Sequence, residues 1–542
     1  MLDEAKGLRN NKTWDDNSVT VLENLKSQAK ELGITVHIAS LHTLCGVKHW
    51  EQPIEQHKYK GRIVYRGGLI KNESDELVLY ADTATTPTSL VALNLALFFG
   101  TCKDNTISLS DAVQAFLQAP LEEETWVLVP FELWLDSWKT KYPRGTKLVV
   151  RLLKSLYGHP LAGKLWQSYL SERLAKLGGV ESELYPSNWF FRRNGHTLLL
   201  NIYVDDLTLC GRSHLHSSFW KELREHVKLD PEAHISEQGS LILGRTHKLF
   251  KRENGAELHF EMTSYAQSIV QFYCELCGIA ESSLKAVPSP ALPESNMSDE
   301  EADEQGWLHK DAAKALMRLL WLSRLSRPEV SFIVCRLAAN VSRWSRWDDR
   351  QLHRLVSYIH HTHTYRCCGK VSYGHGPVVR AYSDADFASC PWTAKSTSGI
   401  VIGVQTGEAF FLLFWQSKKQ SSVARSTSES ESIALAAALF GETLHIQEML
   451  VHLFEISIPV KFEQDNEAVI RIIQNEYSVK LRHCNRVHRV NIASISDLLE
   501  KEDSLALRYC HTKHQLANAL TKILPPIQWS EALDQLCVRD FG

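Results

Sequence analysis

The sequence predicts a mixed α and β protein that is divided into several domains. The chain has 542 residues, and at about 150 residues per domain this length corresponds to three or four domains. Both helix-like and strand-like patterns of apolar residues occur along it. Apolar residues make up 44% and charged residues 23% of the chain. This ordinary globular composition excludes wholesale disorder and the fibrous classes.

The predicted elements follow one another along the chain. Helices are expected over residues 89–99, 312–325, 348–360 and 428–440, and strands over 197–209 (two strands around a turn), 380–404 and 410–415. The last helix is expected to end at Gly441 as a C-cap. An acidic run from Glu294 to Glu304 follows the Pro/Ser stretch Val287–Pro290, and the two together predict an exposed linker or long loop.

No segment predicts a membrane span or a secretory signal. The most apolar run, Leu93 to Phe99, is far shorter than the ~18 residues that a membrane helix needs. The N-terminal stretch MLDEAKGLRNNKTW is polar and charged. The 12 cysteines have no regular spacing, which is typical of reduced thiols in a cytosolic or nuclear protein.

Two groups of cysteine and histidine residues have ligand types that zinc takes. The first comprises His360, His361, His363, Cys367 and Cys368. Its spacing is not that of a zinc ladder, so a helix end followed by buried thiols is expected. The second is the pair Cys274 and Cys277, which has no partner pair and lies in an apolar helical stretch, so core packing is expected.

The charge of the chain is unevenly distributed. The formal net charge of −3 argues against a simple nucleic-acid coating protein, which is usually strongly basic. However, four basic strips contain no acidic residue: 58–66, 137–171, 409–428 and 477–496. Any one strip fits a solvated face. Four of them in one chain favour a track along a phosphate backbone.

A pair of carboxylates is the sharpest local feature. Asp205 and Asp206 lie between two strand-like apolar runs, and Asp favours turns over strands, so the pair is expected at the tip of a hairpin. An ordinary turn is the plain alternative. Asp111 ends an earlier strand-like run. If the three carboxylates meet, they imply bound divalent cations, and hard oxygen ligands suit Mg²⁺.

A spaced series of motifs resembles the polymerase of copia-type LTR retrotransposons. Tyr203–Asp206 is similar to the catalytic hairpin of reverse transcriptases. Four further segments match in the right order: Lys58–Gly67 (KARLVARG in the family), Asp111–Leu117 (DVKTAFL), Lys154–Trp166 (KSLYGLKQAPRQW) and Leu322–Val330 (LSxxTRPDI). His159–Gly163 departs from the family's LKQAP.

The resemblance implies roles for individual residues. Asp111, Asp205 and Asp206 match the metal-binding triad, which holds two Mg²⁺ ions, with Mn²⁺ as an alternative. Five residues match positions that contact the incoming nucleotide: Lys60, Arg62, Phe116, Tyr157 and Gly158. Phe116 matches the bulky gate that selects dNTPs over rNTPs, and core packing is its plain alternative.

A second series, beyond residue 378, resembles the copia-type ribonuclease H domain. Its motifs include Tyr382–Ala388, Lys395–Gly399, Trp415–Gln420 and Ser426–Glu431. The resemblance makes Asp384, Glu431 and Asp465 the Mg²⁺ ligands of a hybrid nuclease. Ser426 and Glu429 fit a capping box. Asn518 replaces an Asp of the family, which predicts weakened cleavage.

These observations predict an α+β polymerase with fingers, palm and thumb, followed by an α/β ribonuclease H-like domain. The expected divisions are 1–57, the start of the polymerase region; 58–260, fingers and palm; 261–377, thumb and connection with the acidic linker; and 378–542, the nuclease. The expected function is RNA-directed DNA synthesis with ribonuclease H activity. The alternative is a degenerate retroelement copy that binds nucleic acid without catalysis.

The resemblance also implies the partners and the location. The expected partners are an RNA template, a DNA primer, the RNA–DNA hybrid, dNTPs and other Gag or Pol products of the element, with no membrane. The expected location is the cytoplasm, within a virus-like particle, or the nucleus.

Overall fold

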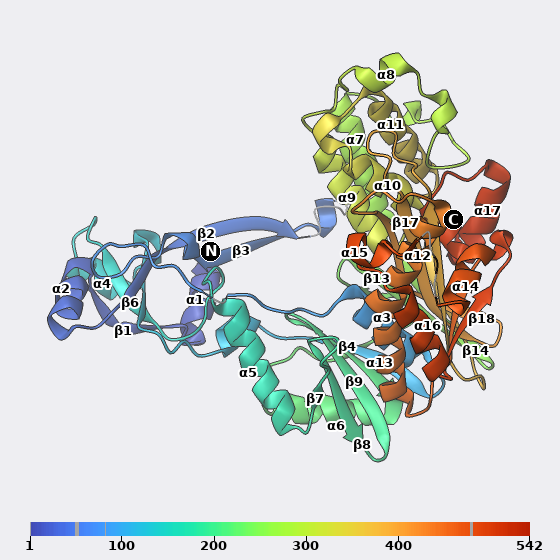
Figure 1. Ribbon diagram of the computed structural model, residues 1–542. Helices are drawn as coiled ribbons and strands as arrows, with labels where there is room; N and C mark the ends of the chain where they lie inside the picture. Colours follow the sequence, from blue (N-terminus) through green and yellow to red (C-terminus); the bar gives the residue numbers. More distant parts are fainter. Residues whose placement is uncertain (1, 49–53, 82, 477, 479–480, 542) are drawn as a thin grey trace. The chain divides into compact units, whose positions relative to one another are not determined.

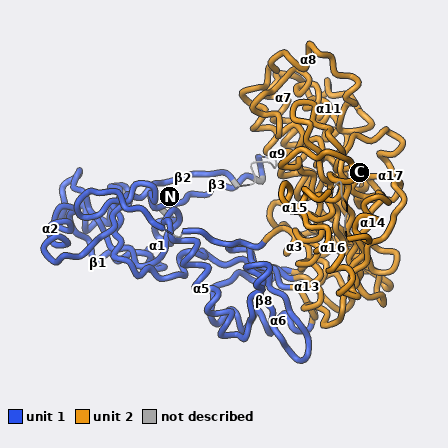
Figure 2. Tube along the Cα trace, in the orientation of Figure 1, with its two compact units in different colours: residues 1–88, 108–209, 214–233 blue, residues 89–107, 210–213, 234–542 orange. Residues whose placement is uncertain are grey.

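The computed structural model describes residues 2–48, 54–81, 83–476, 478 and 481–541 (Figure 1). The chain forms two compact units (Figure 2). Unit 1 comprises residues 1–88, 108–209 and 214–233, and unit 2 comprises residues 89–107, 210–213 and 234–542. Within the described residues, no helix is both long and apolar enough to cross a membrane.

The first sheet of unit 1 has the strand order β1-β6-β5-β2-β3. Its elements are α1 (Leu2–Asn10), β1 (Trp14–Val21), α2 (Leu22–Leu32), β2 (His37–Lys48), β3 (Lys58–Tyr65), β5 (Thr125–Leu128), α4 (Asp136–Lys141) and β6 (Leu148–Leu152). Its buried core includes Trp14, Ile63, Trp138 and Leu156. Most of the basic strip at 58–66 lies on β3, which pairs with β2 in antiparallel orientation.

A second sheet, of order β11-β4-β10-β9-β8-β7, carries the predicted hairpin. Its elements are β4 (Asn105–Asp111), α5 (Ala162–Lys176), β7 (Val180–Glu181), β8 (Asn188–Arg193), β9 (His196–Tyr203), β10 (Asp206–Arg212), α6 (Ser213–Arg224) and β11 (Ala233–His234). Leu198, Leu200, Leu207 and Leu209 are buried with Trp220. The two strands predicted over 197–209 are confirmed.

Unit 2 includes a helical region and a third sheet of order β12-β13-β14-β15-β21. The elements are α3 (Leu90–Thr101), β12 (Ser240–Ile242), β13 (Arg245–Arg252), β14 (Gly255–Glu261), α7 (Thr263–Cys277), α8 (Asp299–Asp303), α9 (Ala312–Leu325), α10 (Ser331–Ala338), α11 (Arg346–His361), β15 (Arg366–Ser372), α17 (Pro526–Gln535) and β21 (Val538–Arg539). Cys274 lies in the helical core, and Cys367 and Cys368 are buried in β15, as predicted.

The acidic segment at 294–304 is not the plain linker that the sequence predicts. It contains the short helix α8, which begins with a capping box between Ser298 and Glu301. Glu301 accepts a hydrogen bond from Arg350 at 2.6 Å, and Glu304 pairs with Arg346 at 2.5 Å. These acids therefore have arginine partners on α11.

The fourth sheet has the order β18-β17-β16-β19-β20, with β16 antiparallel to β17 and parallel to β19. Its elements are β16 (Val378–Asp386), β17 (Thr397–Thr406), β18 (Ala409–Lys419), α12 (Thr427–Ala438), α13 (Leu444–Phe454), β19 (Val460–Gln464), α14 (Glu467–Gln474), α15 (Cys484–Val487), α16 (Ile492–Lys501) and β20 (Leu505–Tyr509). The mixed α and β architecture that the sequence predicts is confirmed.

The prediction that Gly441 caps the helix over 428–440 is wrong. After α12 the chain continues through the π-helical turn Leu439–Thr443 directly into α13. Gly441 lies inside this continuous helical stretch. The apolar residues on both sides of the turn keep the helix packed on the sheet, because Leu435, Leu439 and Ile446 are all buried.

Candidate active sites

A strained turn holds the Asp205–Asp206 pair between β9 and β10. Val204 has φ +59°, a left-handed conformation that costs a β-branched residue on the order of 1–3 kcal/mol. The turn is fixed from two sides, because Trp166 Nε1 donates a hydrogen bond to the Val204 carbonyl at 2.7 Å and the Ala112 N–H donates to the Asp205 carbonyl at 2.8 Å. The second bond brings Asp111 beside the pair.

The three carboxylates influence one another electrostatically. Burial, together with the negative charges of Asp205 and Asp111, raises the pKa of Asp206 to about 6. Asp111 and Asp205 are exposed to solvent. The oxygens of the three do not form a group within 4.8 Å, in contrast to the described residues of the second site below. The first site therefore has carboxylates that are partly exposed to solvent and that repel one another.

Three of the residues that the resemblance assigns to nucleotide contact, Arg62, Tyr157 and Phe116, have side chains that contact one another in a row. The Arg62 guanidinium lies 5.7 Å from the centre of the Tyr157 ring, and that ring lies 5.4 Å from the ring of Phe116. Lys60 lies two residues before Arg62 on β3 and is exposed, and this spacing places both side chains on one face of the strand. Phe116 also lines a cavity with Trp166 and Val204.

Gly158 is required by a close approach of two backbones. Its φ is +87°, and a Cβ atom at this position would lie 2.2 Å from the carbonyl oxygen of Tyr65. The Tyr65 N–H in turn donates to the Tyr157 carbonyl at 2.7 Å. This arrangement joins β3, which carries Arg62, to the segment that carries Tyr157.

The second carboxylate group is tighter and more deeply buried. Asp384 lies on β16, Glu431 lies on α12, and Asp465 directly follows β19. The parallel pairing of β16 with β19 and the packing of α12 on β16 bring them together. Ligand oxygens of the three carboxylates all lie within 4.8 Å of one another.

The electrostatics of this group favour a bound cation. Burial and the charges of Asp384 and Asp465 raise the pKa of Glu431, and burial also raises that of Asp465. The buried Glu431 Oε2 accepts no hydrogen bond. Lys522 Nζ lies 3.4 Å from Asp384 Oδ2, and the hydroxyl of Thr521 donates to the same oxygen.

Thr521 and Lys522 are site residues that sequence reasoning missed. They end the segment Gln515–Lys522, which also contains Asn518. The side chain of Gln515 donates to the carbonyls of Ser383 and Glu463, at 3.1 and 3.2 Å. Gln515 therefore links β16 to the end of β19, and the ammonium group of Lys522 places a positive charge beside Asp384.

Asn518 lies in the same segment and is buried. Its Nδ2 donates to the Thr512 carbonyl at 2.8 Å, whereas its Oδ1 has no hydrogen-bond partner. The Thr512 side chain in turn hydrogen-bonds Asp465 and lowers the pKa of that residue, against the larger effect of burial.

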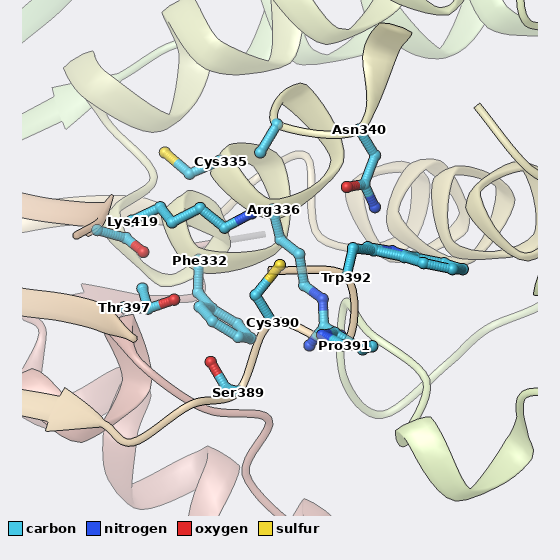
Figure 3. Close-up of a pocket in the computed structure, with 12 residues that line it drawn as sticks. Phe332, Cys335, Arg336, Asn340, Ser389, Cys390, Pro391, Trp392, Thr397 and Lys419 are labelled. Atoms are coloured by element: carbon cyan, nitrogen blue, oxygen red, sulfur yellow. The ribbon is translucent and has the colours of Figure 1, made fainter. Parts of the chain in front are cut away.

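A small pocket lies beside the end of β16 (Figure 3). Arg336, Asn340, Cys390, Trp392 and Lys419 are among the residues that line it. Burial alone would raise the pKa of the Cys390 thiol, but hydrogen bonds from Lys419 and Thr393 lower it to about 7. The pocket therefore presents cationic groups next to an aromatic ring.

Comparison with known proteins shows which part of the chain is similar to a known family. Residues 42–274 match the family described as reverse transcriptase (RNA-dependent DNA polymerase). This range contains Asp111, the Asp205–Asp206 turn and every residue assigned to nucleotide contact. The predicted resemblance to copia-type reverse transcriptases is thus confirmed.

Several curated proteins are similar to the chain at low identity. The Pol polyprotein from transposon TNT 1-94 of Nicotiana tabacum is 23% identical and matches 86% of this chain and 33% of its own length. That from transposon RE1 of Arabidopsis thaliana is 24% identical (70% and 24%), and the Ty1-DR6 Gag-Pol polyprotein of Saccharomyces cerevisiae is 22% identical (86% and 25%). The chain spans a quarter to a third of these relatives.

One solved structure that resembles the chain is the foamy viral protease-reverse transcriptase in complex with double-stranded DNA. It is 11% identical, with a TM-score of 0.44, and the match covers 93% of this chain and 70% of that one.

Proposed function

We propose that this chain is an RNA-directed DNA polymerase with an attached ribonuclease H, which copies retrotransposon RNA into DNA and degrades the RNA of the hybrid. The observation that carries the proposal is the Asp205–Asp206 turn, which is held beside Asp111 within the segment that matches the reverse transcriptase family. The buried carboxylate group of unit 2 supports the nuclease half.

Both carboxylate groups fit Mg²⁺. Their donors are oxygens only, which is the ligand set that this ion prefers. The raised pKa values of Asp206 and Glu431 and the unpartnered Glu431 Oε2 indicate that the negative charge of each group is not fully compensated, although Lys522 offsets part of it in the second group. Asp111, Asp205 and Asp206 would hold the polymerase ions, and Asp384, Glu431 and Asp465 the nuclease ions. When bound, the ions would activate the attacking hydroxyl or water and offset charge on the leaving oxygen.

The remaining residues of the polymerase site orient the substrates. Arg62, which lies against the Tyr157 ring, and Lys60 on the same strand would bind the triphosphate of an incoming dNTP. Phe116 presents a ring that would exclude a 2′-hydroxyl. The bonds from Trp166 and Ala112 keep the turn rigid, so the carboxylates need little reorganisation during the reaction.

Primer extension on an RNA template tests this proposal. The purified chain, supplied with a DNA primer, dNTPs and Mg²⁺, is expected to extend the primer, and an Asp205→Asn variant is expected not to. No extension above that variant would favour the second candidate function, a degenerate copy that binds nucleic acid without catalysis. The observation that favours this candidate is Asn518, which stands where the resemblance expects a carboxylate.

Substitution of Asn518 by Asp is expected to raise the rate of hybrid cleavage. The Asp would add a fourth carboxylate near Asp465 and strengthen cation binding, at the cost of the hydrogen bond from Nδ2 to Thr512. Cleavage of a labelled RNA–DNA hybrid by the two proteins, at equal concentration and with Mg²⁺, measures the effect. Equal rates would show that position 518 does not limit the nuclease.

Without divalent cations, the stability of the chain is expected to fall as the pH rises. The folded-state pKa values of Glu431 and Asp206 lie above their ordinary values of 4.5 and 3.8. The native state therefore keeps protons that the unfolded state has released, and its stability declines from about pH 4 upward, through about pH 6 for Asp206. Mg²⁺ should reverse the decline.

Melting temperatures at about pH 5 and about pH 8, with and without Mg²⁺, measure this effect. A Glu431→Gln variant should show a shallower decline, because it lacks one of the two groups. A stabilisation by Mg²⁺ that is equally large at both pH values would contradict the linkage.

A further inference from the structure

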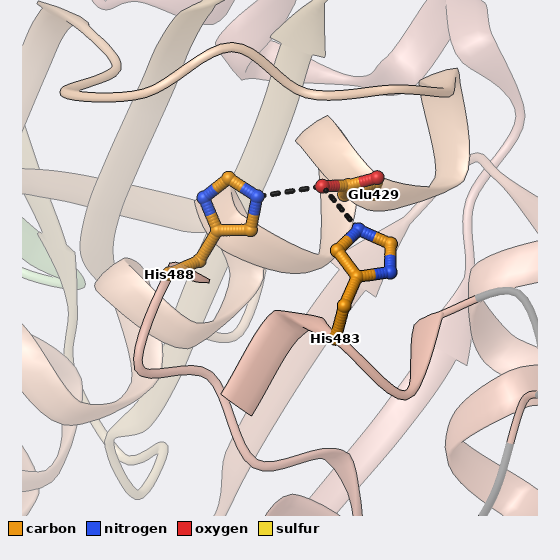
Figure 4. A group of neighbouring side chains, drawn as sticks. All are labelled: Glu429, His483 and His488. Carbon is orange, nitrogen blue, oxygen red and sulfur yellow. Dashed lines mark hydrogen bonds and ion pairs between the residues drawn. The ribbon is translucent and has the colours of Figure 1, made fainter. Parts of the chain in front are cut away.

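A second group of potential metal ligands lies next to the nuclease carboxylates but shares none of them. It comprises Glu429, His483 and His488 (Figure 4). The Nε2 atoms of both histidines point at the same oxygen, Glu429 Oε1, at 3.0 Å from His483 and 2.6 Å from His488. The side chains of Glu429 and His488 are 1% and 2% exposed, and that of His483 is 23% exposed.

The capping box predicted for this position forms only in part. Ser426 Oγ accepts a hydrogen bond from the Glu429 N–H at 3.2 Å, as a capping box requires. The Glu429 carboxylate turns instead to the two histidines and to the Arg425 N–H, which donates to Oε2 at 3.1 Å. Glu429 is therefore committed to a cluster whose other members lie more than fifty positions along the chain.

Outer contacts orient two of the three potential ligands, His488 and Glu429. Ser422 Oγ lies 2.7 Å from His488 Nδ1 and fixes that ring from behind. Arg425 holds one oxygen of Glu429 and leaves the other to face the histidines. Such second contacts, which fix tautomer and orientation, are typical of metal ligands.

We propose that Glu429, His483 and His488 form a zinc-class metal site, distinct from the carboxylate sites for Mg²⁺. Two imidazole nitrogens and one carboxylate are a ligand set that Zn²⁺ takes, with a fourth position left for water. Mg²⁺ prefers oxygen donors and would not compete well for the two nitrogens. The partial exposure of His483 gives a path for the ion and room for the fourth ligand.

The place of the cluster in the fold suggests a structural role. Glu429 lies in the first turn of α12, two residues before Glu431. Residues two apart on a helix point to different faces, so a metal on Glu429 would not occupy the carboxylate group. It would instead tie the segment around α15 to the start of α12, and so fix the turn that presents Glu431 to Asp384 and Asp465.

A hydrogen-bonded clamp without metal is the competing explanation, and the substitutions separate the two. Glu429→Gln keeps an oxygen that can accept from the imidazoles but loses the negative charge. A clamp would survive this change, whereas zinc affinity should fall by about tenfold or more. His483→Gln and His488→Gln each remove one nitrogen ligand, and the exposure of His483 makes its variant the safer one for folding.

The test is the zinc content of the full chain. The protein is stripped with EDTA, incubated with Zn²⁺ in excess Mg²⁺ and desalted, and its zinc is measured by atomic emission. Melting temperatures are recorded with and without Zn²⁺. Two control variants should retain zinc, and shift in melting temperature on adding Zn²⁺, as the unmodified chain does: His309→Gln, a histidine outside the cluster, and Glu431→Gln, which disables the carboxylate site.

The proposal expects one zinc per unmodified chain and a melting temperature that rises with Zn²⁺, with both effects lost in His483→Gln and His488→Gln and weakened in Glu429→Gln. Failure of the unmodified chain to retain zinc would overturn it. Equal zinc content in the cluster variants would also overturn it, as would loss of zinc in Glu431→Gln, which would place the ion at the carboxylates. None of these results depends on polymerase or nuclease activity.

Discussion

Replacement of Asp206 by Asn is expected to abolish primer extension and to raise the melting temperature of the metal-free chain. The Asn keeps the size of the side chain but removes the charge that would bind Mg²⁺. Loss of one such preorganised electrostatic contact costs on the order of a hundred- to a thousandfold in rate. Primer extension on an RNA template measures it.

The rise in melting temperature follows from the pKa of Asp206. Above its pKa of about 6, the ionised carboxylate is disfavoured in the folded state by burial and by Asp205 and Asp111. A neutral amide carries no such penalty, so the variant is more stable than the unmodified chain at neutral pH. A gain in stability together with a loss of activity excludes misfolding as the cause.

The matched control for Asp206→Asn is Asp136→Asn, which changes an exposed carboxylate of unit 1 paired with Lys139. It should extend the primer as the unmodified chain does. Hybrid cleavage should persist in both variants, because the nuclease carboxylates belong to unit 2. Normal extension by Asp206→Asn would remove Asp206 from the polymerase site.

Replacement of Glu431 by Gln is expected to abolish hybrid cleavage and leave primer extension intact. The loss should again be on the order of a hundred- to a thousandfold, because a central charged ligand is gone. The metal-free variant should melt at a higher temperature, since Gln relieves the repulsion with Asp384 and Asp465 and its amide can donate to them.

Cleavage of a labelled hybrid and extension of a primer, measured on the same preparation, separate the two activities of the Glu431→Gln variant. Glu467→Gln is the matched control, since Glu467 is exposed on α14 and pairs only with Arg471 among the ion pairs described. If Glu431→Gln cleaved the hybrid at the normal rate, the carboxylate group of unit 2 would not be the nuclease centre.

Local signals predicted the elements on which these experiments rest. The apolar runs around Asp205 and Asp206 predict two strands and a turn within about a dozen residues. The structure has both strands, β9 and β10, and the turn between them. The helix predicted over 89–99 is α3, which begins at Leu90 with Ser89 as its N-cap. The strands predicted over 380–404 include β16, on which Asp384 lies.

Features that depend on distant parts of the chain were missed. Lys522 reaches Asp384 across 138 positions of sequence, and His488 reaches Glu429 across 59. No local pattern encodes such pairs. The acids at 294–304 suggested a solvated linker because their arginine partners on α11 cannot be seen from composition. Gly441 suggested a stop because the π-turn that carries the helix past it is set by packing on the sheet.

The hydrogen bonds of Gln515 affect the order in which the two carboxylate groups can form during synthesis. During synthesis Asp384, Glu431 and Asp465 all leave the ribosome before the residue that bridges the carbonyls of Ser383 and Glu463. The cation that Lys522 offers to Asp384 arrives later still. The Asp205–Asp206 turn, by contrast, is held by hydrogen bonds from Trp166 and Ala112, both of which precede it in the chain. A nascent chain therefore contains the residues that fix the first carboxylate turn about three hundred residues before it contains Gln515, which bridges the strands of the second group.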